Sequence, residues 1–179
     1  MVRRKTTKDL LAESLRELTK TLPFERITVK DIVQNCGFSS TTFYHHFQDK
    51  YQLVEWIYHT ESRQFVDQIS DTYTWRDSAL NTVIVFRDQI DYYRSYFRSD
   101  GLAANLNMIT YAEAVDTIKK LHGEESINDE VLFLLKLYLN GVNKVTIEWI
   151  LDEKTTLSPE QFIDLIMEAM PEKIKKLLF

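Results

Sequence analysis

The chain has 179 residues, of which 44% are hydrophobic and 27% are charged, the balance of a folded globular protein rather than a disordered one. Its four glycines and three prolines are too few for the many turns of an all-β fold. One cysteine excludes an intrachain disulfide and suits a reducing compartment, and no apolar run approaches the roughly 20 residues needed to span a bilayer. We therefore expect an all-α protein of the cytoplasm, without a membrane segment.

The net charge of −5 is unevenly distributed along the chain. Residues 1–50 hold nine Lys and Arg against six Asp and Glu, a net charge of +3, and the remaining residues carry −8. This asymmetry indicates that the N-terminal end meets a polyanion, although chance alone can also produce it.

The first part of the chain has the pattern of three short helices and a long one. The predicted helices cover residues 7–20, 29–35, about 40–47 and 50–70. Thr28 can cap the second helix, Ser39 or Ser40 the third, and Asp49 the fourth. Between the second and third helices, Gly37 can take the positive φ that ends a helix.

Further helices are predicted beyond a break at residues 73–77. They cover residues 77–90, 91–97, 102–121, 129–151 and 159 to the C-terminus, with interruptions at 99–101, 122–126 and Pro171. Ser158 at a cap position followed by Pro159 is a strong helix start. The one β-prone run, at residues 83–86, lies inside a helical pattern.

The second and third predicted helices have the spacing of a helix-turn-helix. In this motif the second helix enters the major groove of DNA and presents its N-terminal residues to base edges. Here Phe43 and Phe47, four residues apart, form a buried stripe with Phe38. The outward-facing side chains can bond phosphates and base edges; they are Ser40, Thr41, Tyr44 and His45.

Residues 24–50 resemble the DNA-binding signature of the TetR family. The signature combines a Thr-hydrophobic-x-x-Ile helix, here at 28–32, with a small residue and Gly at 36–37. An aromatic-Tyr-x-x-Phe helix follows at 43–47, and then Lys50. The resemblance covers about residues 8–56. It implies an N-terminal three-helix domain and a C-terminal helical domain that binds an effector and dimerises, with bounds expected at 1–50 and 51–179.

The resemblance also implies roles for individual residues. Thr28, helped by the helix N-terminus, and Lys50 are expected to contact phosphate, and Tyr44 to contact the DNA backbone or a base. We expect the side chains of Tyr44 and Lys50 to be exposed. The full DNA-binding set is Thr28, Ser39, Ser40, Thr41, Thr42, Tyr44, His45 and Lys50. The family usually has Val in place of Phe38, and often a basic residue or Gly at 40–41, which leaves base specificity open.

Each role has a structural alternative. Thr28 can act as a helix cap, and Tyr44 can pack within the chain. His45 and His46 are adjacent, so on a helix they point about 100° apart and rarely share a metal ion. We therefore expect no metal and no cofactor.

The C-terminal half is rich in aromatic side chains, and a mixed aromatic and amide lining suits a small ligand. The resemblance implies such a pocket, and the residues expected to line it are Phe86, Tyr93, Tyr96, Phe97, Asn105, Tyr111 and Tyr138. Core packing is the simplest explanation for the helical stripe of Phe86, Ile90, Tyr93 and Phe97.

The predicted helix at 129–151 is apolar on adjoining faces, which indicates burial on more than one side. Gly141 in its middle costs about 1 kcal/mol against Ala, for which a close helix approach would compensate. In the family the last two long helices form a four-helix dimer interface. The residues expected there are Leu135, Leu139, Val142, Phe162 and Ile166. A monomer core has the same periodicity.

The resemblance implies a regulator that binds a pseudo-palindromic operator in double-stranded DNA as a homodimer, most often a repressor released by a small-molecule effector. Residues 41–58 and 141–150 are similar to a Firmicutes-type branch that includes regulators of dihydroxyacetone kinase genes. An activator controlled by a protein co-regulator is therefore an alternative, as is a helical interaction module without DNA binding. No glycine-rich phosphate loop, Gly-x-Ser-x-Gly or metal-ligand spacing favours an enzyme.

Overall fold

The computed structural model of the chain describes residues 4–70, 72–98 and 103–179, the last range with side chains from Leu106 onward. Within these residues the structure is helical, with no strand beyond an isolated bridge, which confirms the all-α prediction. The elements are α1 (Thr7–Thr19), η1 (Phe24–Arg26), α2 (Val29–Asn35), α3 (Ser40–Tyr44), α4 (Lys50–Val66), α5 (Trp75–Asp88), α6 (Ile90–Phe97), α7 (Ala103–His122), η2 (Glu124–Ser126), α8 (Asp129–Leu151), α9 (Pro159–Glu168) and α10 (Glu172–Leu178).

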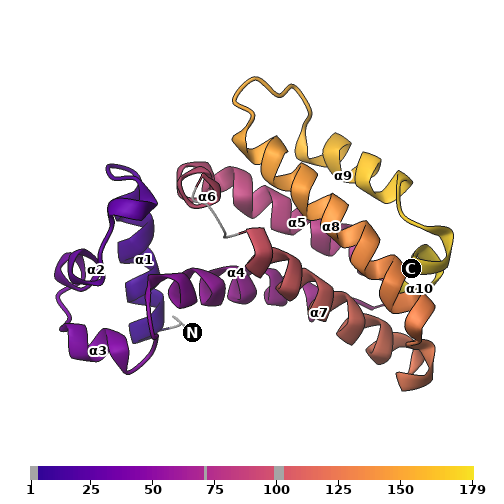
Figure 1. Cartoon of the computed structure of the whole chain (residues 1–179), viewed down its shortest axis with the longest axis horizontal. Helices are drawn as coiled ribbons and strands as arrows, with labels where there is room; N and C mark the ends of the chain where they lie inside the picture. The colour runs from indigo at the N-terminus through magenta and orange to yellow at the C-terminus, as the bar shows by residue number, and fades with distance from the viewer. Residues whose placement is uncertain (1–3, 71, 99–102) are drawn as a thin grey trace.

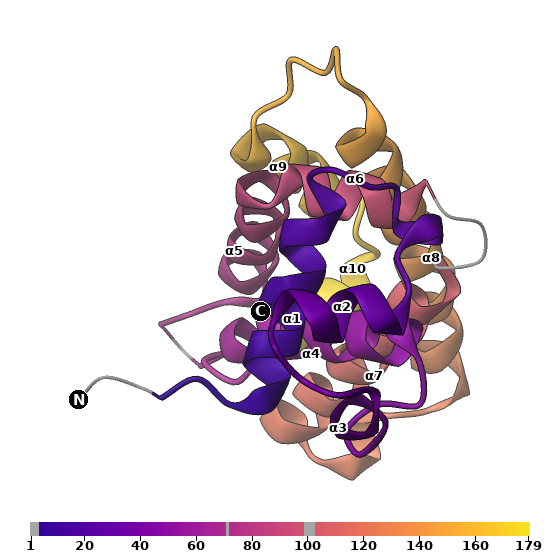
Figure 2. The same ribbon diagram turned by 90° about the vertical axis from the view of Figure 1, so that its left-hand side faces the viewer.

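Helices α1, α2 and α3 form one end of the molecule, and α4 runs from this end into a larger bundle (Figure 1). Viewed from that end, the three short helices lie in front of the bundle (Figure 2). Helix α1 packs against α2, α4 and α6, and α2 packs against α3. The side chains of Leu11, Leu15, Ile32 and Phe43 are fully covered at the centre of this arrangement.

Local capping decides where the short helices begin. Thr28 accepts a hydrogen bond from the N–H of Asp31, whose carboxylate accepts one from the N–H of Thr28, so the pair forms a capping box. Ser39 caps α3 and Asp49 caps α4, as predicted. Gly37 has φ +75° in the turn between α2 and α3, a conformation that favours glycine.

Some helix ends differ from the prediction. Helices α3 and α4 end earlier than expected, at Tyr44 and Val66. Helix α5 begins at Trp75, inside the predicted break, because Thr74 and Asp77 form another capping box there. A Thr followed three residues later by Asp is a start signal that outweighs the loop character of the residues around it.

The larger bundle packs α7 along α4 and α8, and α5 along α4 and α9, while α10 packs on α7 and α8. Trp149 of α8 stacks on Phe162 of α9, with ring centroids 4.7 Å apart. The predicted interruption at Pro171 separates α9 from α10. The break predicted at 99–101 lies outside the described residues. Among the described helices, none combines the length and apolar character needed to cross a lipid bilayer.

A polar cluster connects the two ends of the molecule. Glu61 of α4 accepts hydrogen bonds from Arg16 of α1 at 2.5 Å, from Gln89 at 2.8 Å and from the hydroxyl of Tyr93 in α6. We call these four residues the Glu61 cluster. Because a carboxylate with several charge-assisted partners holds its neighbours in fixed positions, the cluster fixes α1 relative to α4 and α6.

Candidate functional site

Helix α3 presents a polar face to solvent because its apolar face is held in the core. Phe43 and Phe47 are buried, and their rings lie 5.7 Å apart. Tyr44, the next residue after Phe43, points outward and is 59% exposed. The arrangement is that of a helix-turn-helix, in which the second helix is free to enter a groove of DNA.

Four of the predicted DNA-binding side chains have no hydrogen-bond partner within the described part of the chain: Ser40, Thr41, Tyr44 and His45. All four are exposed. Their hydroxyl and imidazole groups therefore keep their donors and acceptors available for an external partner. We call these four residues the free face of α3.

The other predicted contacts on α2 and α3 already have partners inside the chain. Both the hydroxyl and the N–H of Thr28 donate to the Asp31 carboxylate, at 2.6 and 2.9 Å. The hydrogen bonds from Thr28 lower the pKa of Asp31. The carboxylate therefore stays ionised near the position where a phosphate is predicted. The hydroxyls of Ser39 and Thr42 lie 2.9 Å apart and bond each other.

Lys50 differs from the expectation of an exposed side chain. Its ammonium donates to the carbonyl oxygens of Phe24, Glu25 and Ile27, at 2.7, 3.0 and 2.8 Å, so all three of its N–H groups are engaged. It also lies 4.5 Å from the centre of the Phe24 ring. Burial lowers the pKa of Lys50, and the nearby Glu25 opposes the shift. The side chain is partly buried and fastens α4 to η1; its phosphate contact stays a prediction.

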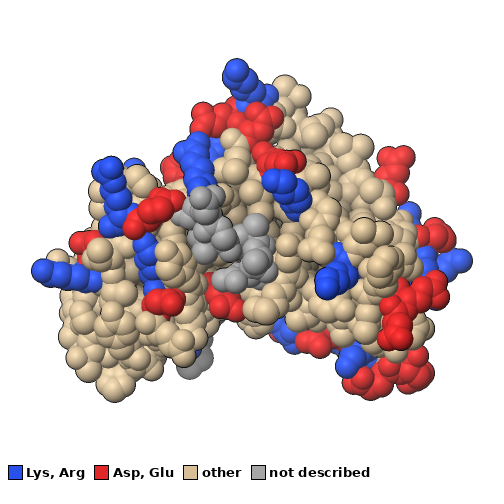
Figure 3. All heavy atoms as spheres, viewed as in Figure 1, with Lys and Arg blue, Asp and Glu red and all other residues tan. Residues whose placement is uncertain are grey.

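Exposed basic side chains lie at the C-cap of α1 and on η1 and α2, at the same end of the molecule as α3. Lys20, Arg26 and Lys30 are exposed, and Figure 3 shows Lys and Arg protruding from the end formed by α1–α3. Asp and Glu side chains gather at the opposite end in the same view. The charge asymmetry of the sequence is therefore also an asymmetry in space, with the sign that attracts a polyanion to the α3 end.

The residues predicted to line an effector pocket fall in different places. Phe86 and Tyr138 line a cavity between α4, α5, α7, α8 and α9. Tyr93 and Tyr96 are buried in ring packing between α4 and α6, as is most of Phe97. Tyr111 lines a groove on the surface of α7 and α8 instead. The side chain of Asn105 lies outside the described residues.

The cavity contains a carboxyl group that the sequence did not indicate. Glu113 lines it and is only 4% exposed, and its carboxylate accepts a hydrogen bond from the hydroxyl of Ser62 at 2.6 Å. Burial raises the pKa of Glu113 to about 7. A glutamate on a helix is normally solvated, so spacing alone gives no signal for this residue.

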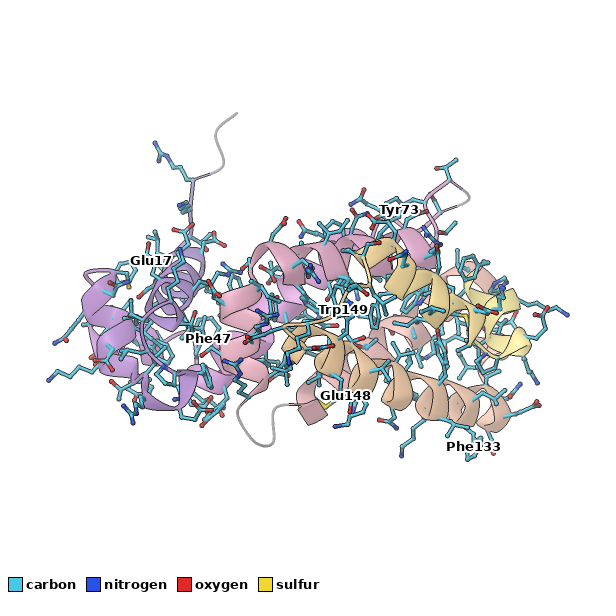
Figure 4. The ribbon with its side chains drawn as sticks, turned by 90° about the horizontal axis from the view of Figure 1, so that it is seen from above. Glu17, Phe47, Tyr73, Phe133, Glu148 and Trp149 are labelled. Carbon is cyan, nitrogen blue, oxygen red and sulfur yellow. The ribbon has the colours of Figure 1, made fainter. Side chains whose placement is uncertain are left out.

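Most side chains predicted for a dimer interface are buried within one chain. Leu135, Leu139, Phe162 and Ile166 are inside the bundle, where a second chain cannot reach them without rearrangement, and Val142 is half-buried. The exposed apolar residues of α8 lie between them and are separated by steps of four: Phe133, Leu137 and Val145. Figure 4 shows Phe133 projecting from the outer side of α8. Helix α9 adds the exposed Leu165.

Known proteins resemble the chain in sequence over part of its length. Residues 11–57 match the family described as bacterial regulatory proteins, tetR family. The HTH-type dhaKLM operon transcriptional activator DhaS of Lactococcus lactis subsp. lactis (strain IL1403) is 23% identical over 112 residues. Those residues are 63% of this chain and 60% of that protein, so the match spans less than two thirds of the relative's length.

Solved structures resemble the chain over nearly all of its length. A dihydroxyacetone kinase operon activator DhaS gives a TM-score of 0.68 at 21% identity, over 95% of this chain and 97% of that one. The TetR family repressor AlkX from Dietzia sp. strain DQ12-45-1b, implicated in biodegradation of n-alkanes, gives 0.55 at 12% identity, over 99% and 100%. At these identities the likeness shows a shared fold. Together with the sequence match over residues 11–57, it shows that the chain is similar to transcription regulators of the tetR family in its N-terminal part and shares their fold.

Proposed function

We propose that the protein binds operator DNA as a homodimer and that an effector in its C-terminal part controls this binding. The observation that carries the proposal is the free face of α3, four exposed polar side chains that form no hydrogen bond with another described residue, at the end of the molecule formed by α1–α3. Such side chains can reach base edges and phosphates when the helix lies in the major groove.

The two groups of predicted DNA contacts then have different tasks. Ser40, Thr41, Tyr44 and His45 are proposed to read the groove, because no side chain that the structure describes engages their polar groups in a hydrogen bond. Thr28 and Lys50 hold the scaffold through Asp31 and the η1 carbonyls, and a phosphate would have to share their donors. We propose a DNA-binding domain at residues 1–50 and an effector and dimerisation domain at 51–179.

The outer face of α8 supports the homodimer. Phe133, Leu137 and Val145 are exposed at every fourth position, and the remaining member of this row is the exposed Gly141. No atom of the described chain would lie within 4 Å of a Cβ added to Gly141, so no helix of the same chain exploits the missing side chain. A second copy packed along this row would cover the apolar side chains and approach closely at the glycine.

A two-fold dimer places its two α3 helices symmetrically. They would reach successive major grooves if their separation were about 34–36 Å, one turn of the duplex. The operator is then pseudo-palindromic, because the symmetry of the site mirrors that of the protein. The Glu61 cluster connects α1 to α4 and α6. A movement of α4 or α6 in the bundle would therefore also move α1, and with it the separation of the two α3 helices would change.

Activation rather than repression is the second proposal. The relative that matches in sequence and the structure with a TM-score of 0.68 are both named activators of dihydroxyacetone kinase genes, whereas the named repressor gives 0.55. This ordering favours a regulator whose bound state promotes transcription. A reporter gene placed behind the selected operator would show higher expression with the protein than without it, and lower expression would contradict activation.

Selection of bound duplexes from a random DNA pool tests the proposed function. We expect enrichment of a sequence with two inverted half-sites and an affinity for it about a thousandfold or more above that for random duplex at the same salt concentration. Equal affinity for selected and random DNA would contradict the proposal and favour the interaction module without DNA binding.

A further inference from the structure

The cavity between α4, α5, α7, α8 and α9 has a volume of about 80 Å³. Most of its wall is apolar, formed by side chains such as Trp75, Val83 and Phe86. An engineered apolar cavity of about 150 Å³ in another protein holds a benzene molecule, so this one suits a ligand of a few non-hydrogen atoms.

Glu113 is the charged group of this wall and lacks a countercharge. Among the described residues, no Lys, Arg or His forms an ion pair with it. The nearest cation, Arg63, bonds Asp67 at 2.7 Å and lies 3.8 Å from Asp116. The one side chain that donates to Glu113 in the described part of the chain is the neutral Ser62. A buried carboxylate without a cation is costly, and a positively charged partner would relieve that cost.

Four hydroxyl groups line the same cavity as Glu113, and their own protons are already engaged. Thr82, Thr110 and Thr146 each line it, and each donates its hydroxyl proton to a carbonyl of its own helix, at 2.9, 2.9 and 2.8 Å. Tyr138 likewise donates to the carbonyl of Ile166 at 2.7 Å. A hydroxyl has one proton, so these four groups can only accept further hydrogen bonds.

We propose that this cavity binds a small organic cation, a primary ammonium on a short apolar stem, with its N–H groups donating to Glu113 and the threonine oxygens. The inference rests on the proposed function, in which the C-terminal part receives an effector. An ammonium has three donors and no acceptor, which complements the Glu113 carboxylate and the four hydroxyl oxygens, and a short alkyl stem fits the apolar side chains.

Three probes of similar size and different charge separate this class from others: propylammonium, 1-propanol and propionate. Each is titrated into the isotopically labelled full chain at about pH 8, where a carboxyl with a pKa of about 7 is largely ionised, and amide shifts are followed by NMR. We expect propylammonium to shift amides of α5, α7 and α8 around the cavity. Its Kd should be about tenfold or more below that of 1-propanol, and propionate should not bind.

Variants of α7 locate the site. Glu113→Gln keeps the shape of the side chain and should raise the Kd for propylammonium about tenfold or more while leaving that for 1-propanol unchanged. Asp116→Asn, an exposed carboxylate on the same helix, is the matched control and should bind propylammonium as the wild type does. Sodium chloride at equal concentration controls for ionic strength.

Two results would overturn the inference. One is 1-propanol or propionate binding the wild type as tightly as propylammonium, which decides the matter even where Glu113→Gln fails to fold. The other is a folded Glu113→Gln variant that retains wild-type affinity for the cation. The titration contains no DNA, so the two experiments are independent. A negative titration would not contradict operator binding, and a failure to bind operator DNA would not contradict binding of the cation.

Discussion

The ammonium of Lys50, at the start of α4, donates a hydrogen bond to the carbonyl oxygen of Phe24 at 2.7 Å. The same group bonds the carbonyls of Glu25 and Ile27, so one side chain ties the backbone of η1 and the residue after it to the helix that enters the bundle. Lys50 therefore positions α2 and α3 relative to α4, whatever it also does at DNA.

Replacement of Lys50 by Met should destabilise the protein. The variant keeps the apolar stem but leaves three carbonyl oxygens without their charged donor, and we expect a loss of roughly 1–3 kcal/mol in the free energy of unfolding. Urea denaturation measures this loss. Lys30→Met, at an exposed lysine of α2, is the control and should change stability by less than about 0.5 kcal/mol. Equal stability of the two variants would show that the Lys50 contacts contribute nothing.

Glu113 should make stability depend on pH. Because the pKa of Glu113 is raised to about 7 in the folded protein, the folded state binds its proton more tightly than the unfolded state does. Its contribution is therefore most favourable at low pH and is lost as pH rises from about 4.5 to about 7, by roughly 3 kcal/mol in total. The charged groups facing it are Arg63, which opposes the shift, and Asp67 and Asp116, which add to it.

The check is the free energy of unfolding of Glu113→Gln relative to wild type at about pH 5 and about pH 8. The free energy of unfolding of Glu113→Gln should increase relative to that of the wild type as pH rises, while Glu168→Gln, at an exposed carboxylate of α9, should show no such increase. A difference between Glu113→Gln and wild type that is the same at both pH values would contradict a buried carboxyl titrating in this range.

The Arg16–Glu61 pair should couple the α1–α3 end to the bundle. A double-mutant cycle with Arg16→Met and Glu61→Gln should give an interaction energy of about 1 kcal/mol or more, because both side chains are largely covered and Glu61 has further partners. The exposed pair of Lys5 and Glu13 is the control, for which about 0–1 kcal/mol is typical. An interaction energy for Arg16–Glu61 no larger than that of the control pair would contradict the claim that the Glu61 cluster couples the two ends of the molecule.

Substitution of Leu137 by Glu should separate a dimer without unfolding the chain. Leu137 is 64% exposed in the single chain, so a carboxylate there costs little unless a second copy covers it. Sedimentation velocity should show a dimer for the wild type and a monomer for the variant. Leu22→Glu, at an exposed leucine between α1 and η1, should leave the dimer intact. A wild type that sediments as a monomer at micromolar concentration would contradict the proposed assembly.

The fold could be predicted from the sequence because its helices follow local rules. Thr28, Ser39, Asp49 and Ser158 all cap the helices that they were expected to cap, since a cap depends on residues three positions away. The start of α5 differs from the prediction because its cap, Thr74, lies within a stretch whose other residues favour a loop.

The sequence predicted the site residues whose role depends only on their being exposed on a helix, and it did not predict the contacts made between distant parts of the chain. Tyr44 is exposed as its place on the helix predicts, whereas Lys50 bonds carbonyls that no spacing rule connects to it. Leu139 and Leu137 are both apolar residues of α8, and which of them faces the core depends on where α7 and α9 pack. Glu113 has the sequence signature of a solvated residue, and its burial follows from tertiary neighbours alone.

The affinity of the Tyr44→Ala variant for the selected operator tests the DNA-reading role of α3 most directly, with fluorescence anisotropy as the readout at one fixed salt concentration. Because Tyr44 is 59% exposed, the variant should unfold at the same urea concentration as wild type yet bind operator about tenfold or more weakly, a loss of roughly 1–3 kcal/mol. His59→Ala, at an exposed position of α4, should bind as wild type does. Wild-type operator affinity in both Tyr44→Ala and Thr41→Ala would show that α3 does not read DNA.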